Sequence, residues 1–183
     1  MRLPVQVEGI IFRRNGGVIE YLLLKRLPER NGFWQPVTGG VEEGETREEA
    51  LRREIREETG VKNIIALIEG LYYFEFSDPN PNQEYVYGVE VSPSEEIVLD
   101  GKEHSECRWC SYKEALRSLN WKENKVALRR LNRTLTRLTL SHLGPQNANK
   151  RLMSTGKKTE GAGHLFALFT VNRFGSVLSM ATI

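Results

Sequence analysis

GGVEEGETREEALRREIREETGV runs from Gly39 to Val61 of this 183-residue chain and carries eight glutamates. Thr46 is followed three residues later by Glu49, which is the pattern of a capping box at a helix N-terminus. Gly60 is typical of the residue at which a helix stops. The stretch therefore predicts a helix that begins after Thr46 and ends before Gly60.

The predicted helix carries several glutamates on one face. Glu54, Glu57 and Glu58 are three and four residues apart, so their side chains project close together. Like charges at this spacing repel each other by about 0.2–0.5 kcal/mol per pair. A solvated helix with salt bridges is one explanation, because Glu48 and Arg52 also have i,i+4 spacing.

The glycines ahead of the helix favour a different explanation. Gly39, Gly40 and Gly44 are not needed by a solvated helix, whereas a site that brings the backbone close to a phosphate uses such residues. Hard oxygen ligands gathered on one face suit Mg²⁺, or alternatively Mn²⁺. We therefore interpret the carboxylates as a platform for a divalent cation.

Charge and apolar content limit the class of protein. The formal net charge is +2, but residues 144–183 hold five Lys or Arg and one Glu, so residues 1–143 have a net charge of −2. We expect no nucleic-acid partner for this body. No basic leader precedes an apolar run, and no apolar stretch approaches the ~20 residues that span a bilayer. The sequence predicts a cytoplasmic protein without a membrane partner.

The remaining elements predict an α/β fold with a mixed β-sheet packed between helices. Residues 1–143 should form one domain, and 144–183 a basic, flexible or peripheral tail. Cys107 and Cys110 are interpreted as strand residues rather than a redox pair or half a zinc site. The predicted elements are a hairpin of 5–12 and 18–24, a loop over 25–44, strands at 61–76, 85–91 and 107–111, and helices at 112–119 and 122–140.

The acidic stretch also carries a family resemblance. Gly39, Glu45 and the run from Arg53 to Val61 match every specified position of the Nudix box, G-x5-E-x7-R-E-U-x-E-E-x-G-U, in which U is aliphatic. The chain therefore resembles the Nudix hydrolases. The resemblance implies the Nudix α/β/α sandwich, with a mixed sheet between helices, and hydrolysis of a nucleoside diphosphate linked to another moiety.

The box implies roles for particular side chains. Glu54, Glu57 and Glu58 would hold the cation, and one of them, or a downstream glutamate, would accept a proton from the attacking water. Arg53 would orient Glu57, and Glu45 would support the loop or a second metal ion. The sequence does not separate the general base from the metal ligands.

A second resemblance concerns the substrate. FWQPVTGGVEEGET at 33–46 is similar to the bacterial dihydroneopterin triphosphate and dATP pyrophosphohydrolases. It implies that a small nucleotide or pterin triphosphate is cleaved to a monophosphate and pyrophosphate. The loop between Arg26 and Trp34 is one residue longer than in that pattern, which predicts a different pocket entrance. The weaker downstream matches are Glu103-His104, Trp109, Trp121 and Asn124.

The same resemblance implies a set of ligand contacts, each with a structural alternative. Arg26 is otherwise a charge at the end of a surface strand, Thr38 a turn residue and Glu103 an exposed acid. Trp34 stacks on the heterocycle or anchors its loop to the core. The implied substrate-binding residues are Arg26, Trp34, Thr38, Gly39 and Asn124, and Glu103 joins Glu54, Glu57 and Glu58 as a metal ligand.

Three other functions compete with this interpretation. Dinucleoside polyphosphate hydrolases usually carry Pro-Lys-Gly before the box, whereas this chain has Val37-Thr38-Gly39. A general nucleotide-pool sanitising enzyme would carry the same box, so the box alone does not separate it from the favoured interpretation. A nucleotide-sensing module without turnover commonly loses box carboxylates, and this chain retains all of them. The oligomeric state is open.

Overall fold

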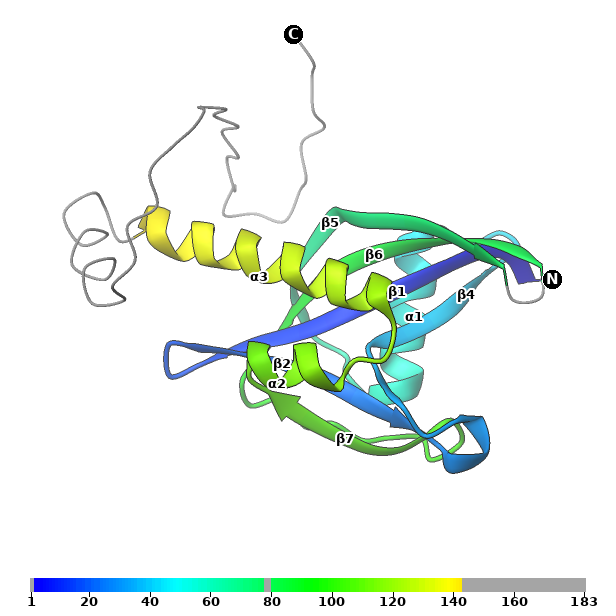
Figure 1. Cartoon of the computed structure of the whole chain (residues 1–183), viewed down its shortest axis with the longest axis horizontal. Helices are drawn as coiled ribbons and strands as arrows, with labels where there is room; N and C mark the ends of the chain where they lie inside the picture. Colours follow the sequence, from blue (N-terminus) through cyan, green and yellow to red (C-terminus); the bar gives the residue numbers. More distant parts are fainter. Residues whose placement is uncertain (1, 78–79, 143–183) are drawn as a thin grey trace, which may run out of the picture. The chain divides into compact units, whose positions relative to one another are not determined.

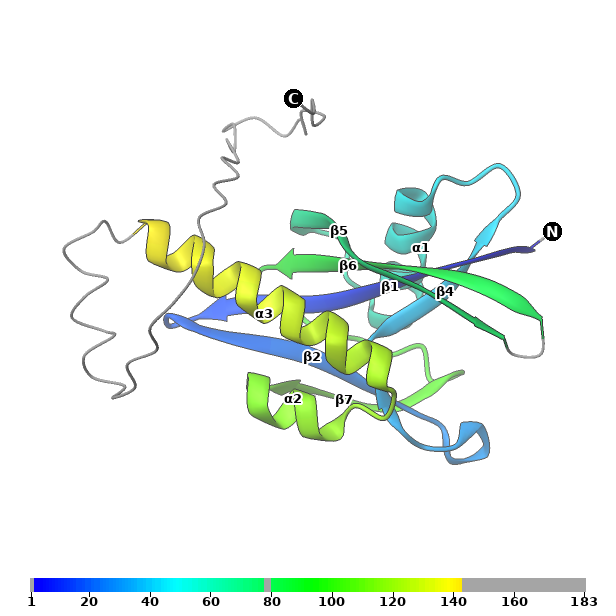
Figure 2. The same cartoon turned by 45° about the horizontal axis from the view of Figure 1, so that its top comes forward.

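The computed structural model describes residues 2–77 and 80–142, in which a mixed β-sheet lies between helices (Figures 1 and 2). The predicted tail, 144–183, lies outside the described residues. The strands are β1 (Arg2–Asn15), β2 (Val18–Arg26), β3 (Trp34–Gln35), β4 (Val37–Glu42), β5 (Ile64–Ser77), β6 (Pro81–Val91) and β7 (His104–Cys110). The helices are α1 (Arg47–Thr59), α2 (Tyr112–Ser118) and α3 (Lys122–His142), with a 3₁₀ turn η1 (Pro28–Arg30).

The sheet is built around β1. Its strand order is β3-β2-β1-β6-β5, while β4 also pairs with β1 and β7 with β2. β1 and β6 run parallel, and the other pairs are antiparallel. The mixed sheet and the predicted hairpin of β1 and β2 are confirmed.

The alternation of side chains along β1 produces two apolar cores, one on each face of the sheet. Val7 and Ile11 pack in one cluster with residues of α1. Ile10 and Phe12 pack in the other cluster with residues of α2 and α3. The predicted α/β/α sandwich is therefore confirmed (Figure 2).

Two glycines allow α1 and α3 to approach the sheet closely. A Cβ atom at Gly9 of β1 would lie 3.0 Å from Leu51 Cδ1 of α1. A Cβ atom at Gly88 of β6 would lie 2.6 Å from Leu131 Cδ1 of α3, which is closer than side chains pack. Larger residues at these positions would force the Leu51 and Leu131 side chains to shift.

The ends of α1 confirm the prediction from the sequence. The Thr46 hydroxyl accepts a hydrogen bond from the Glu49 amide, and the Glu49 carboxylate accepts one from the Thr46 amide at 2.8 Å. Gly60 has a left-handed φ of 71° and ends the helix. Leu51 and Ile55 are fully buried, as expected from their place opposite the acidic face.

Two expectations about the strands were wrong, and the strands predicted at 61–76 and 107–111 begin instead at Ile64 and His104. The segment 25–44 is not mostly loop, because Val37–Glu42 pairs with β1 even though it contains Gly39 and Gly40. β6 begins at Pro81 rather than at residue 85, because polar residues continue the ladder with β5. Local propensity is poor in both segments, and pairing with a neighbouring strand overrides it.

Two smaller expectations concern the cysteines and the membrane. Cys107 and Cys110 are free thiols in β7, and Cys110 is buried in the core on the α3 side, as the strand-packing interpretation predicts. No helix in the described part of the chain combines the length and apolar content that a membrane crossing requires.

Replacing Leu51 with Ala should lower the free energy of unfolding by about 2–5 kcal/mol, because it leaves a cavity between α1 and β1. Ile65→Ala is the control, since Ile65 is 61% exposed on β5, and should change that energy by less than about 1 kcal/mol. Urea denaturation followed by circular dichroism measures both. Equal losses would contradict the assigned face of α1.

Candidate active site

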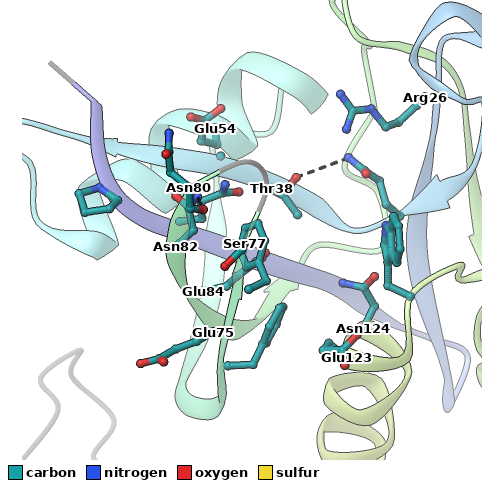
Figure 3. A pocket seen from close by; sticks show the side chains of 18 of the residues that line it. Arg26, Thr38, Glu54, Glu75, Ser77, Asn80, Asn82, Glu84, Glu123 and Asn124 are labelled. Atoms are coloured by element: carbon teal, nitrogen blue, oxygen red, sulfur yellow. Dashed lines mark hydrogen bonds between the residues drawn. The ribbon is translucent and has the colours of Figure 1, made fainter.

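A cavity of about 1140 Å³ brings most of the predicted site residues together. Figure 3 shows Glu54 of α1 at one end and Asn124 of α3 at the other, with Thr38 of β4 between them. The predicted residues that line it are Arg26, Thr38, Gly39, Glu54, Glu58, Glu103 and Asn124. Arg53, Glu57 and Trp34 are not among the lining residues.

Arg53 holds the segment that leads into α1. Its Nε and Nη2 atoms donate to the two carboxylate oxygens of Glu45 at 2.7 and 3.0 Å, and Nη2 also donates to the Gly40 carbonyl at 2.9 Å. The Arg53 hydrogen bonds lower the pKa of Glu45 to about 2. Glu45 therefore supports the turn, which is one of the two roles expected for it.

Glu57 differs from the expectation in its contact with Arg53. Its carboxylate lies 3.5 Å from Arg53 Nη1, whereas Glu54 lies 2.6 Å from the same atom. The Glu57 side chain is 55% exposed. Arg53 orients Glu45 and Glu54 more firmly than Glu57, because its fork of donors faces the turn.

Gly39 makes room for a carboxylate. A Cβ atom at this position would lie 1.9 Å from Glu54 Cδ, so the Glu54 carboxyl occupies the space that a side chain at residue 39 would fill. The glycine was expected to admit a phosphate. In the structure its lack of a side chain admits Glu54 to the cavity.

Glu58 is the most deeply buried carboxyl at this end of the cavity. Burial first, and then the charges of Glu54 and Glu103, raise the pKa of Glu58 to about 9. Its Oε2 atom has no hydrogen-bond partner and lies 4.0 Å from Nδ1 of the buried His104. Burial also lowers the pKa of His104. The charge of Arg26 opposes the rise in the pKa of Glu58 only in part.

These carboxyls fit a divalent cation in chemistry but are not arranged as a finished metal site. No group of three or more metal-ligating side chains converges within residues 2–77 and 80–142. Glu54 is paired with Arg53, and Glu103 is paired with Arg30 at 3.1 Å. The unpartnered oxygen of Glu58 and the hard oxygen donors beside it are the features that suit Mg²⁺.

Arg26 and Thr38 also line the cavity. The Nε atom of Arg26 is buried and has no hydrogen-bond partner, so a donor is left for an anion. The Arg26 guanidinium also lies 5.7 Å from the Phe33 ring. Thr38 Oγ1 accepts a hydrogen bond of 3.5 Å from Gln35, drawn as the dashed line in Figure 3.

Trp34 does not reach the cavity. It precedes Gln35 in β3, and successive side chains of a strand point to opposite faces. Gln35 lines the cavity, whereas Trp34 packs against the core on the α3 side, with the Arg108 guanidinium 4.1 Å from its ring. The structure favours the alternative in which Trp34 anchors its segment. The aromatic residues that line the cavity near Arg26 are Phe33 and Trp121.

Two buried carboxyls of the sheet were missed. Glu8 of β1 is fully buried and accepts a hydrogen bond of 2.6 Å from Asn124 Nδ2. Glu84 of β6 is 6% exposed and lines the cavity. One signal was present in the sequence, because Glu8 stands at the alternation position shared by Ile10 and Phe12, where an acid is unexpected.

Comparison with known proteins gives the family context. A family model described as NUDIX domain matches residues 2–131. The chain is 32% identical over 131 residues to an octanoyltransferase of Myxococcus xanthus, covering 69% of this chain and 36% of that protein. It is 36% identical over 92 residues to the NAD-capped RNA hydrolase NudC of Salmonella heidelberg, covering 50% and 34%. The chain thus spans about a third of these relatives' length.

Solved structures share the fold. A protein of Listeria monocytogenes assigned to the NUDIX hydrolases is 29% identical, with a TM-score of 0.66 over 74% of this chain and 96% of that one. The E. coli dihydroneopterin triphosphate pyrophosphohydrolase is 26% identical, with a TM-score of 0.59 and coverages of 70% and 94%. A C. elegans Ap4A hydrolase, at 23% identity and a TM-score of 0.64 over 72% and 97%, shows likeness of fold alone.

Replacing Gly39 with Ala should displace the Glu54 carboxyl while leaving the fold intact, because the clash is with the end of a flexible side chain. We expect the affinity for Mn²⁺, measured by calorimetry, to fall by about 10- to 100-fold. The melting temperature should stay within a few degrees of the parent value. Unchanged Mn²⁺ affinity in a folded variant would show that Glu54 does not need this position.

Proposed function

Because the chain belongs to the NUDIX family, we propose that it hydrolyses a nucleoside or pteridine triphosphate, such as dihydroneopterin triphosphate or dATP, to a monophosphate and pyrophosphate. One observation carries the proposal. A single cavity is lined by Glu54 and Glu58 of the acidic helix, by Arg26, whose Nε has no partner, and by Asn124 and Trp121. Such a cavity suits a ligand with phosphates at one end and a heterocycle at the other.

Mg²⁺, or Mn²⁺, would be held by Glu54, Glu57, Glu58 and Glu103. When bound, such a cation neutralises phosphate charge and lowers the pKa of a coordinated water. Arg26 would pair with a phosphate oxygen, since a fixed guanidinium matches phosphate geometry. Arg53 would keep Glu54 and the preceding turn in position through its hydrogen bonds. One of the α1 carboxylates would take the proton of the attacking water.

The rest of the substrate contacts follow from the cavity. Thr38 and Gly39 would lie beside the phosphates, and Asn124 would face the heterocycle. We assign this activity to residues 1–143 of a cytoplasmic protein. The similarity to the E. coli dihydroneopterin triphosphate pyrophosphohydrolase supports the proposed substrate. The likeness to the Salmonella NAD-capped RNA hydrolase NudC favours dinucleotides as the second candidate.

Phosphorus NMR of the products tests the substrate. The purified chain with Mg²⁺ should release pyrophosphate from dihydroneopterin triphosphate or dATP at least about tenfold faster than it cleaves the alternatives. The alternatives are diadenosine tetraphosphate, NAD⁺ and ADP-ribose. Preferential cleavage of a dinucleotide would be consistent with a hydrolase but would refute the assignment of a triphosphate substrate. If none of these compounds is cleaved, the result would favour a nucleotide-sensing module without turnover.

Substitutions on α1 test the catalytic face. Glu57→Gln and Glu58→Gln should each reduce kcat by about 100-fold or more, because each removes a carboxylate that can hold the cation or take a proton. Glu48→Gln is a matched control, since Glu48 lies on the same helix and pairs with Arg52 in solvent. Its kcat should change less than twofold. A normal kcat in folded Glu58→Gln would refute the assigned face.

A further inference from the structure

A buried imidazole lies behind the carboxyls of the cavity. His104, the first residue of β7, is 1% exposed and is not among the residues that line the cavity. Its Nδ1 atom has no hydrogen-bond partner within residues 2–77 and 80–142. Unpartnered buried polar atoms are uncommon, because such an atom has lost its hydrogen bond to water without replacing it. A partner for the Nδ1 atom is therefore expected nearby.

The group that faces this atom is the carboxyl of Glu58 on α1. Glu58 Oε2 also has no partner, and it lies 4.0 Å from His104 Nδ1. A hydrogen bond between nitrogen and oxygen is about 2.7–3.2 Å long, so an approach of about 1 Å would join the two atoms. Arg26 acts on Glu58 through its charge, but no hydrogen bond connects these two side chains in the described part of the chain. The imidazole is thus the donor best placed for the buried oxygen of Glu58.

Gln35 faces the other nitrogen of the ring. Its Nε2 atom lies 3.4 Å from His104 Nε2 and 3.5 Å from Thr38 Oγ1, the contact drawn as a dashed line in Figure 3. A carboxamide nitrogen carries two protons and only donates, so both atoms that it faces are acceptors. The Nε2 atom of the imidazole is consequently unprotonated, and the single proton of the neutral ring lies on Nδ1. This tautomer directs an N–H group at Glu58.

Such a donor would decide which oxygen of Glu58 is free. Glu58 lines the cavity, although its Oε2 atom is buried and faces His104. A hydrogen bond from the ring to Oε2 would fix the plane of the carboxylate and leave Oε1 for the cavity. Partners that hold a metal ligand in place in this way strengthen metal binding, because the ligand is already oriented before the cation arrives.

We propose that His104 is a positioning residue, which donates its Nδ1–H to Oε2 of Glu58 and thereby orients the Oε1 atom of that carboxylate toward a divalent cation. Gln35 acts one step further from the cation, because it fixes the tautomer of the ring. The inference rests on the proposed function, since that function assigns Glu58 to the cation. It connects β3 and β7 to the acidic face of α1 through one chain of side chains.

Nitrogen NMR of the ring tests the tautomer in the unaltered protein. The full chain has three histidines. It is labelled with ¹⁵N-histidine and studied without metal at mildly alkaline pH, and His104→Asn identifies the His104 signals by their loss. Two-bond proton–nitrogen correlations should show Nδ1 protonated and Nε2 unprotonated. Gln35→Met removes the donor to Nε2, so its ring should also populate the Nε2–H tautomer. An unaltered protein with the proton on Nε2 would overturn the proposal.

Substitutions at residue 104 test the donor through Mn²⁺ binding, measured by calorimetry. His104→Ala should weaken Mn²⁺ binding by about 10- to 100-fold, because the orientation of Glu58 is lost. The amide nitrogen of Asn can take the place of Nδ1, whereas that of Gln takes the place of Nε2. His104→Asn should therefore retain the affinity within about threefold, and His104→Gln should resemble His104→Ala. Ser105→Ala is the control, since Ser105 is exposed on the same strand, and should leave the affinity unchanged.

A purely structural role for His104 predicts a different pattern. Equal Mn²⁺ affinities in folded His104→Asn and His104→Gln would overturn the proposal, and so would an unchanged affinity in folded His104→Ala. Gln35→Met leaves His104 in place and serves as a second variant, should the substitutions at residue 104 prevent folding. It should weaken Mn²⁺ binding by about threefold or more, and an unchanged affinity would again contradict the proposal.

Failure of this inference is separable from failure of the proposed function. Cleavage of triphosphates by a protein whose Mn²⁺ affinity is unchanged in His104→Ala refutes only the inference. Loss of Mn²⁺ affinity in His104→Ala and its rescue in His104→Asn, without cleavage of any triphosphate, refute only the proposed reaction.

Discussion

The guanidinium of Arg53 joins α1 to β4 and to the turn that precedes the helix. Its donors reach both oxygens of Glu45, the Gly40 carbonyl and the Glu54 carboxylate, and the side chain is only 19% exposed. A planar fork can satisfy these acceptors together, whereas an ammonium group cannot. The relative position of helix and strand determines where the acidic face meets the cavity. The site therefore depends on one charged group that does not itself line the cavity.

Features that depend on local sequence were predictable. The helix, its capping box, its buried Leu51 and Ile55, and its acidic face all follow from spacing within a few turns. β4 was missed because Gly39 and Gly40 have little strand propensity, and because the pairing with β1 that imposes the strand involves residues far away in the sequence. Long-range pairing is not visible in the pattern of a single segment.

The same distinction divides the candidate site. The box carboxylates come from one helix, so their spacing alone placed them together, and the structure adds the contact between Gly39 and Glu54. The parallel ladder of β1 and β6 brings Glu8 and Glu84 to one face of the sheet, which no local pattern indicates. Trp34 was expected at the substrate because of its motif, but the alternation of β3 turns it away from the cavity. Motif and geometry thus assign different aromatic residues to the pocket.

The carboxyls buried at both ends of the cavity have a consequence for selection. Burial raises the pKa values of Glu8, Glu58 and Glu84, which means that folding must desolvate groups that would be charged in water. Neutral side chains of the same shape would relieve this cost, so the residues that give the cavity its chemistry oppose folding. A library of variants chosen only for heat resistance would therefore accumulate replacements at these three positions. Survivors of such a screen would be the more robust proteins and the poorer binders.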